Sequence, residues 1–309
     1  MTSAPEGGEG AAAGEADGGE AAAGPAVAVV VVNHNTRDDL LACLDSLADA
    51  GADEILVVDS GSSDGSAEAA AARPGVRCIA LDNVGFGQAA NAGVAQTGAE
   101  VLILANADTR FKHAAARALG EYLQSHPDVG AVGPRIRFPD GRVQLSVRAF
   151  PSLRQAIGHA LLGLWWPANP WTRAYRLTDW DHDREGEVDW VSGCCIAVRR
   201  AAFEQLGGFD AAYFMFVEDV DLCYRLWQAG WKVAYAPVTE VIHDIGGAVS
   251  RRRYRMIVEH ARSLDRFFGR RYAGSWRRLA RPLIRLGLVG WVLAAAAWTL
   301  ARGKTHAHA

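Results

Sequence analysis

Three carboxylates stand together at the start of a predicted helix and suit proton-transfer chemistry. Glu218, Asp219 and Asp221 follow the aromatic-rich run Tyr213–Phe216 and open a helix predicted over residues 220–229. Carboxylates at a helix N-terminus satisfy free backbone N–H groups and meet the positive end of the helix dipole, so one of the three is expected to act as a cap. Capping needs only one acid. An acid held beside aromatic rings indicates a functional site, where pKa values are often shifted.

Polar residues also follow three apolar runs that are predicted strands. Asn33, Asp59 and Asp108 stand at or just beyond the ends of these runs. Helical patterns alternate with the runs, which indicates βαβ units and a parallel sheet. Ligands bind beyond the carboxyl ends of such strands, so the three residues are expected at one binding edge. The predicted strands of this half are Ala26–Val32, Ile55–Val58, Val76–Leu81 and Val101–Ala105.

Local signals predict three further features. Thr36 with Asp39 has the spacing of a capping box. The turn at residues 139–141 (Pro-Asp-Gly) predicts a hairpin of strands Val129–Arg137 and Arg142–Val147. Residues 188–198 predict one strand, and 232–236 with 241–243 two short ones. The four tryptophans of the loop-like residues 151–187 either line a sugar or lipid site or pack a lid onto the core.

Charge divides the chain into three parts. Residues 1–26 are rich in Ala, Gly and Glu, carry five acids and no basic residue, and are predicted to be disordered. Residues 27–250 carry 18 Lys/Arg against 28 Asp/Glu, whereas residues 251–309 carry 14 against 2. The second part is predicted to be the catalytic domain. The third is a basic helical arm, which indicates an anionic surface as its partner.

The arm contains an apolar segment, residues 283–301, in which Arg285 is the one charge. The last 16 residues of this segment carry no charge, just short of the roughly 17–25 residues that span a bilayer. A transmembrane helix, an interfacial helix and a soluble helix docked on the core all remain open. More arginines precede the segment than follow it, so a membrane orientation would keep the domain in the cytoplasm.

Two compositional features restrict the function classes. None of the five cysteines forms a C-x-x-C pair, which favours a reducing environment and core packing over redox chemistry. Gly85-Phe86-Gly87 is followed by Ala90, and it does not come directly after the first strand, so a dinucleotide-binding oxidoreductase is excluded.

The set VVVVNHN, ILVVDSGSSDGS, LILANAD, FMFVEDVDLCYR and EVIHDIGGAVS, in this order, resembles family 2 of the glycosyltransferases. Within that family the chain looks like the bacterial rhamnosyltransferase-type members that build cell-surface polysaccharides. The resemblance covers roughly residues 26–250. It implies the GT-A fold, an α/β, Rossmann-like architecture with a mostly parallel central sheet and flanking helices, here followed by the helical arm.

The resemblance also implies roles for individual residues. Asp219 would be the base that takes the proton of the acceptor hydroxyl, and Glu218 would orient the acceptor or Asp219; Asp221 would be the cap or a supporting group. Asp108 and His243 would bind Mg²⁺ or Mn²⁺, since hard cations prefer oxygen ligands. Asn106 replaces the first acid of the family's D-x-D-type motif, leaving one strong anionic ligand. The residues expected to bind the nucleotide are Asn33, Asn35, Asp59, Asn91 and Asn106.

The implied activity is inverting transfer of a sugar, rhamnose being the first choice, from a dTDP- or UDP-sugar to a saccharide or polyprenyl-diphosphate-linked acceptor. The basic arm would hold the enzyme at the cytoplasmic face of the cell membrane, and no nucleic-acid partner is expected. Two alternatives stand beside this activity. A sugar-nucleotidyltransferase would need a Gly-rich basic loop after the first strand, and the sequence has none there. An inactive membrane-attached scaffold would be expected to lack Asp108, Glu218 and Asp219, which are all present.

Overall fold

The computed structural model describes residues 24–152, 166, 169–244 and 253–305. The predicted disordered tail, residues 1–26, lies almost wholly outside the described residues, as does part of the tryptophan-rich loop. The strands are β1 (Val27–Asn33), β2 (Glu54–Ser60), β3 (Val76–Leu81), β4 (Val101–Asn106), β5 (Thr109–Phe111), β6 (Val129–Arg137), β7 (Val147–Arg148), β8 (Gly186–Glu187), β9 (Trp190–Val191), β10 (Cys195–Arg199) and β11 (Lys232–His243).

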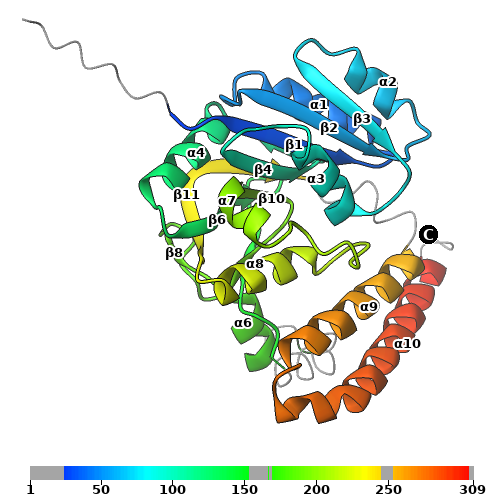
Figure 1. Ribbon diagram of the computed structural model, residues 1–309. Helices are drawn as coiled ribbons and strands as arrows, with labels where there is room; N and C mark the ends of the chain where they lie inside the picture. Colours follow the sequence, from blue (N-terminus) through cyan, green and yellow to red (C-terminus); the bar gives the residue numbers. More distant parts are fainter. Residues whose placement is uncertain (1–23, 153–165, 167–168, 245–252, 306–309) are drawn as a thin grey trace, which may run out of the picture.

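Helices connect and cover these strands (Figure 1). They are α1 (Arg37–Leu47), α2 (Ser66–Ala71), α3 (Phe86–Val94), α4 (Ala115–Ser125), α6 (Pro170–Arg176), α7 (Arg200–Gln205), α8 (Glu218–Gln228), α9 (Arg253–Arg271), the 3₁₀ turn η2 (Trp276–Ala280) and α10 (Arg281–Thr305).

The central sheet has the order β3-β2-β1-β4-β10-β6-β11-β5, with β8 beside β11. Strands β1 to β4 are parallel, β10 runs antiparallel between β4 and β6, and β11 is parallel to β6. The sheet is thus mostly parallel where βαβ units were predicted. The carboxyl ends of β1, β2 and β4 meet at one edge.

Two apolar layers form because alternate residues of β1 point to opposite faces of the sheet. Val27, Val29 and Val31 pack with α1, α2 and α4, whereas Ala28 and Val30 pack with α3 and α8. Both faces of β1 are therefore buried, which explains its uninterrupted β-branched sequence.

Two predicted strand assignments are wrong. Residues 142–147 form no second hairpin strand; a single bridge joins Arg137 to Val143, and β7 pairs with β9 in a separate two-stranded sheet. Residues 188–198 are split into β9, in that small sheet, and β10, in the central sheet. Ser192 and Gly193 interrupt the apolar run, and the chain changes sheets there. In contrast, β11 joins the two short strands predicted over residues 232–243 into one.

The predicted capping box at Thr36 is also absent. The Thr36 hydroxyl donates to Asn33 Oδ1 at 2.7 Å and makes no cap hydrogen bond to α1. Asp39 forms an ion pair with Arg110 at 3.3 Å instead. The turn after β1 therefore uses the hydroxyl to fix Asn33 rather than to begin the helix.

The helical arm packs as an antiparallel pair of helices below the sheet (Figure 1). Phe267 and Phe268 of α9 are buried, so α9 belongs to the same packed body as the predicted catalytic domain. The second helix, α10, exposes large apolar side chains. Within the described residues, Trp276–Ala297 is the one helical stretch long and apolar enough to cross a bilayer, judged by length and composition alone.

Candidate active site

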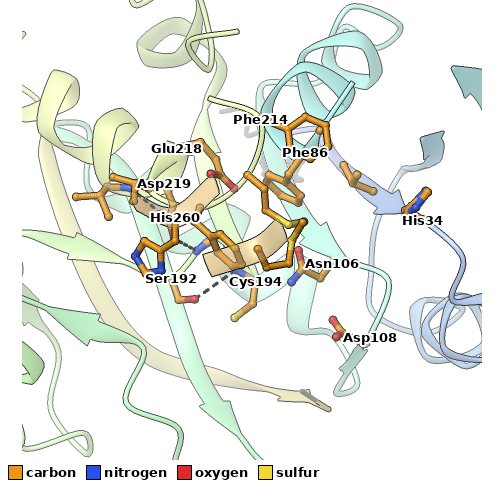
Figure 2. Close-up of a pocket in the computed structure, with 18 of the residues that line it drawn as sticks. His34, Phe86, Asn106, Asp108, Ser192, Cys194, Phe214, Glu218, Asp219 and His260 are labelled. Atoms are coloured by element: carbon orange, nitrogen blue, oxygen red, sulfur yellow. Dashed lines mark hydrogen bonds between the residues drawn. The ribbon is translucent and has the colours of Figure 1, made fainter. Parts of the chain in front are cut away.

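A cavity of about 400 Å³ lies beyond the carboxyl ends of β1 and β4. The start of α8 and one side of α9 line the cavity together with the strand ends. Residues from distant parts of the chain therefore meet around it (Figure 2). Asp108, His243, Glu218 and Asp219 all line this cavity. The structure therefore places Asp108 and Glu218, which are 110 positions apart in the sequence, in the wall of one cavity.

The backbone just before α8 is strained. Phe216 and Val217 have φ angles of +65° and +68°, a left-handed conformation that is rare for a β-branched residue such as valine. Such strain persists where the surrounding structure imposes it, often at functional sites. Here it directs the first two residues of α8, Glu218 and Asp219, into the cavity (Figure 2).

Asp219 is held by two backbone donors. The Gly193 N–H donates to Oδ2 and the Val220 N–H donates to Oδ1, both at 2.8 Å. A Cβ at position 193 would lie 3.0 Å from the Asp219 Cβ, so glycine permits this close approach. Burial raises the pKa of Asp219, while the N–H groups of Gly193 and Val220 and the charge of Arg148 act in the opposite direction.

Glu218 lies beside Asp219 in a different environment. Its side chain is buried, and Oε2 has no hydrogen-bond donor among the described residues. Burial and the neighbouring Asp219 carboxylate raise the pKa of Glu218 to about 8. Glu218 is therefore protonated at neutral pH and able to donate a hydrogen bond, whereas Asp219 has donors that favour its ionised form.

Asp221 does not face the cavity and is not a helix cap. It is fully buried and accepts from the Tyr213 hydroxyl at 3.2 Å, from Arg225 Nε at 2.7 Å and from Arg270 Nη1 at 2.7 Å. Val217, the left-handed residue before α8, makes no side-chain cap hydrogen bond. The acid that satisfies a free N–H in the first turn is Asp219, which accepts from Val220, and not Asp221. Asp221 connects α8 to the arm helix α9.

Asp108 and His243 form the group suited to a cation. Thr109 lies opposite His243 in the pairing of β5 with β11, which places Asp108 Oδ1 3.2 Å from His243 Nε2. Although this distance allows an ion pair, no donor among the described residues is aligned for a hydrogen bond to Asp108 Oδ1. Burial by itself would lower the pKa of His243, but Asp108 and Cys194 outweigh it and raise the pKa to about 10.

The pair fits a hard divalent cation, which would replace the proton on His243 Nε2, because histidine binds a metal only in its neutral form. His243 Nδ1 lies 3.1 Å from Gln144 Oε1 and donates to it, which directs Nε2 toward Asp108. A buried carboxylate oxygen without an aligned donor is then available as a ligand. No cluster of three or more His, Cys, Asp or Glu side chains occurs at this edge or elsewhere in the described part of the chain, so phosphate and water oxygens would complete the coordination.

The residues predicted to bind the nucleotide divide into three groups. Asn33 and Asn106 line the cavity. Asp59 lies behind Asn33 and accepts from its amide at 2.8 Å, and Asn35 accepts from the Ser63 N–H at 2.8 Å, so both organise the loops at this edge. Asn91 lies outside the cavity, because its amide makes two hydrogen bonds of 2.9 Å with the backbone of Phe209.

Several cavity residues were not anticipated from the sequence. His34 follows Asn33 directly and donates from Nδ1 to the Ser60 carbonyl at 2.7 Å, a position that the NHN motif itself indicated. Arg148 on β7 and both Arg255 and His260 on α9 also line the cavity. These three lie outside the strand ends and outside the acidic motif, and no spacing in the sequence linked them to either.

Relatives support a role in sugar transfer. An N-acetylglucosaminyl-diphospho-decaprenol L-rhamnosyltransferase of Mycobacterium tuberculosis is 40% identical over 274 residues, which cover 84% of this chain and 89% of that protein. The rhamnosyltransferase WbbL of Escherichia coli K12 is 30% identical over 228 residues, covering 70% of this chain and 83% of the relative.

Solved structures share the fold. The mannosyltransferase PcManGT of Pyrobaculum calidifontis, in complex with GDP-Man and Mn²⁺, superposes with a TM-score of 0.55 at 20% identity, covering 93% of this chain and 81% of that chain. GalNAc-T7 with UDP, GalNAc and Mn²⁺ gives a TM-score of 0.53 at 18% identity, with coverages of 72% and 44%. Residues 28–207 match the family described as Glycosyl transferase family 2. The chain therefore belongs to glycosyltransferase family 2 and has the GT-A fold.

Proposed function

We propose that this protein transfers L-rhamnose from dTDP-rhamnose, with inversion, to an N-acetylglucosaminyl-diphospho-polyprenol acceptor in cell-surface polysaccharide synthesis. The observation that carries the proposal is that one cavity contains both a cation-binding pair, Asp108 and His243, and an acid pair, Glu218 and Asp219. Sequence identity of 40% over most of a mycobacterial rhamnosyltransferase supports the choice of sugar and acceptor.

Asp219 is the general base in this proposal. It accepts the proton of the acceptor hydroxyl as that oxygen attacks the anomeric carbon, and the bond from that carbon to the diphosphate breaks on the opposite side. One displacement inverts the configuration, and the bonding electrons leave with the nucleoside diphosphate. The two backbone N–H groups hold Asp219 in one orientation, and position is the first requirement of a base. Protonated Glu218 donates a hydrogen bond that orients the acceptor.

The donor lies at the other side of the cavity. Asn33 and Asn106 are placed to contact the nucleotide sugar. Asp59 supports Asn33 directly, and Asn35 supports it through the Ser62 hydroxyl. Asp108 and His243 would hold Mg²⁺ or Mn²⁺ against the diphosphate. A divalent cation there supplies Lewis-acid stabilisation of the charge that develops on the leaving diphosphate.

The arm keeps this reaction at the membrane. α10 exposes Leu283, Leu286 and Leu293, and the arginines that precede its apolar part suit anionic headgroups. The same arginine bias favours the cytoplasmic face. A polyprenyl-linked acceptor would then reach the cavity from the bilayer beside α9 and α10.

The test is transfer by the full-length protein from a panel of nucleotide sugars to a synthetic N-acetylglucosaminyl-diphospho-alkyl acceptor, with and without Mg²⁺ or Mn²⁺. We expect a product heavier by one rhamnose from dTDP-rhamnose, with the anomeric configuration opposite to that of the donor by NMR. Asp219→Asn should slow transfer by about 10²–10⁴-fold, the usual contribution of a general base, with dTDP binding nearly intact.

Asp140→Asn, in an exposed turn outside the cavity, is the matched control. A different preferred donor would overturn the choice of rhamnose. Turnover by Asp219→Asn at the wild-type rate would remove Asp219 from its role.

A further inference from the structure

Arg148 is a cationic side chain in the cavity, and the proposed donor and base sites give it no role. It lies on β7 directly opposite Trp190 of β9 in the small two-stranded sheet. Its guanidinium carbon stands 5.4 Å from the centre of the Trp190 ring and 5.8 Å from that of Tyr175. All three side chains line the cavity. The aromatic rings therefore hold a guanidinium in place at the cavity wall.

Arg148 makes no ion pair with any carboxylate in the described part of the chain. Four other partly buried arginines do pair with an acid: Arg135 and Arg137 with Glu240, and Arg225 and Arg270 with Asp221. Arg199 and Arg271 also lack an ion pair among the described residues, but unlike Arg148 they do not line the cavity. A guanidinium presents five donors that match the oxygens of a phosphate or carboxylate. An arginine oriented by rings rather than by an acid, and open to a cavity, has its donors free for an anionic ligand.

The location of Arg148 indicates which substrate carries that anion. The strand that pairs with β7 continues into Ser192 and Gly193, and the Gly193 N–H holds Asp219. Arg148 and Asp219 line the same cavity, and the charge of Arg148 opposes the rise in the pKa of Asp219 that burial causes. Asp219 and Asp108 lie on different sides of the cavity (Figure 2). Arg148 is thus on the side of the proposed base, where the acceptor binds, and not on the cation side.

We propose that Arg148 binds the diphosphate of the lipid-linked acceptor. This inference rests on the proposed function, because it takes the acceptor to be a sugar diphosphate. Only one sugar ring separates the attacking hydroxyl from the diphosphate, so a group near Asp219 can contact the diphosphate while the base contacts the hydroxyl.

The test compares two acceptors that differ only in the diphosphate: N-acetylglucosaminyl-diphospho-alkyl and the neutral alkyl N-acetylglucosaminide with the same chain. The measurement is the ratio of their kcat/KM values. Arg148→Ala should reduce this ratio by about 10- to 100-fold, the effect of removing a charge-assisted hydrogen bond. Arg148→Lys keeps the charge but not the fork of donors, so it should give an intermediate ratio. Arg142→Ala, an exposed arginine outside the cavity, should leave the ratio at the wild-type value.

Three results would overturn the inference while leaving the proposed function intact. Equal losses with both acceptors would show that Arg148 supports the fold or Asp219 only. Weaker binding of dTDP by calorimetry, with an unchanged acceptor ratio, would place Arg148 on the donor diphosphate instead. If the wild-type protein used both acceptors equally well, the acceptor diphosphate would not be recognised and Arg148 could not be its ligand. If the wild-type protein used neither acceptor, the proposed function would be wrong, and the inference that rests on it would be wrong as well. The Lys variant gives the same comparison if the Ala variant does not fold.

Discussion

Three acids within four residues have three different roles, because a helix turns each successive side chain by about 100°. Asp219 points to the Gly193 N–H, Glu218 keeps a carboxyl oxygen without a donor, and Asp221 turns away into a cluster of arginines. A carboxyl group is thus the proposed base at Asp219, a protonated acid at Glu218 and a structural anchor at Asp221, according to its neighbours. Burial and hydrogen-bond donors, rather than the acid itself, set each role.

The raised pKa of Glu218 predicts a pH-dependent stability. The folded protein retains this proton up to about pH 8, whereas an unfolded glutamic acid loses it near pH 4.5. The stability from this group is complete below pH 4.5 and is lost as pH rises to about 8. Glu218→Gln, which cannot ionise, should therefore raise Tm more at pH 8 than at pH 5. Glu121→Gln, exposed on α4, is the control. An equal change in Tm at both pH values would contradict the raised pKa of Glu218.

Gln144 predicts a separate effect on cation binding. Its side-chain oxygen fixes the orientation of His243 by accepting from Nδ1 at 3.1 Å. Loss of such a supporting contact weakens metal affinity about 10- to 100-fold. Gln144→Ala should raise the Mn²⁺ concentration for half-maximal transfer by that factor, while excess Mn²⁺ restores the rate. Gln124→Ala, exposed on α4, should change neither quantity. A rate that stays low at saturating Mn²⁺ would indicate a different role for Gln144.

At the level of elements, α9 is part of the catalytic body. Its first turns supply Arg255, Met256 and His260 to the cavity, and its last turns bury Phe267 and Phe268. Deleting residues 251–309 would therefore open the active site as well as remove the arm. Loss of activity on such a deletion cannot be attributed to membrane release. Single substitutions on each helix separate the two effects.

Arg270 should tie α9 to the start of α8. It donates to Asp221 at 2.7 and 2.8 Å and also pairs with Asp210. Removing one partner of a buried ion pair costs about 3–5 kcal/mol. The lower end of this range applies here because Arg225 still pairs with Asp221. Arg270→Ala should lower the free energy of unfolding by about 3 kcal/mol. Arg262→Ala, on the exposed side of α9, should change it by less than about 0.5 kcal/mol. Urea unfolding gives both values, and equal losses would contradict the role of Arg270.

At the scale of the whole molecule, the described residues form a packed catalytic body with one exposed apolar helix. Leu283, Leu286 and Leu293 are 72%, 69% and 65% exposed. Asp265 of α9 pairs with Arg281 at 3.4 Å and Arg285 at 3.0 Å, which holds α10 alongside α9 while its apolar side faces outward. A docked soluble helix would bury these leucines, so this geometry favours the two membrane hypotheses.

Replacing these three leucines with serine should reduce membrane binding without unfolding the protein. Each leucine transferred to an apolar medium contributes about 1.5 kcal/mol or more, so the fraction bound to anionic vesicles should fall at least tenfold. The leucines have few contacts in the folded chain, and Tm should stay almost unchanged. Val238→Ser, exposed on β11, is the control. Unchanged vesicle flotation would contradict the membrane role of α10. Carbonate extraction of wild-type membranes then separates a spanning helix, which resists it, from an interfacial one.

The sequence by itself determined the elements whose signals are local. The strands β1 to β4, the polar residues at their ends and the apolar arm follow from runs of side chains along the chain. The ordered motifs also indicated the family. Errors occurred where a local signal had a tertiary competitor: Thr36 bonds Asn33 instead of capping α1, and the run 188–198 is shared between two sheets.

Only the tertiary structure decided which of the polar residues share a site. Asn91 has the same residue type as Asn33, yet both ends of its amide bond the backbone of Phe209. Arg148 lines the cavity from a two-residue strand that no periodicity reveals. Asp219 and Asp221 are separated by one position, yet Asp219 lines the cavity and Asp221 is buried against Arg225 and Arg270. The physical reason is that pairing, burial and charge are set by contacts between distant segments, and a linear pattern contains no record of those contacts.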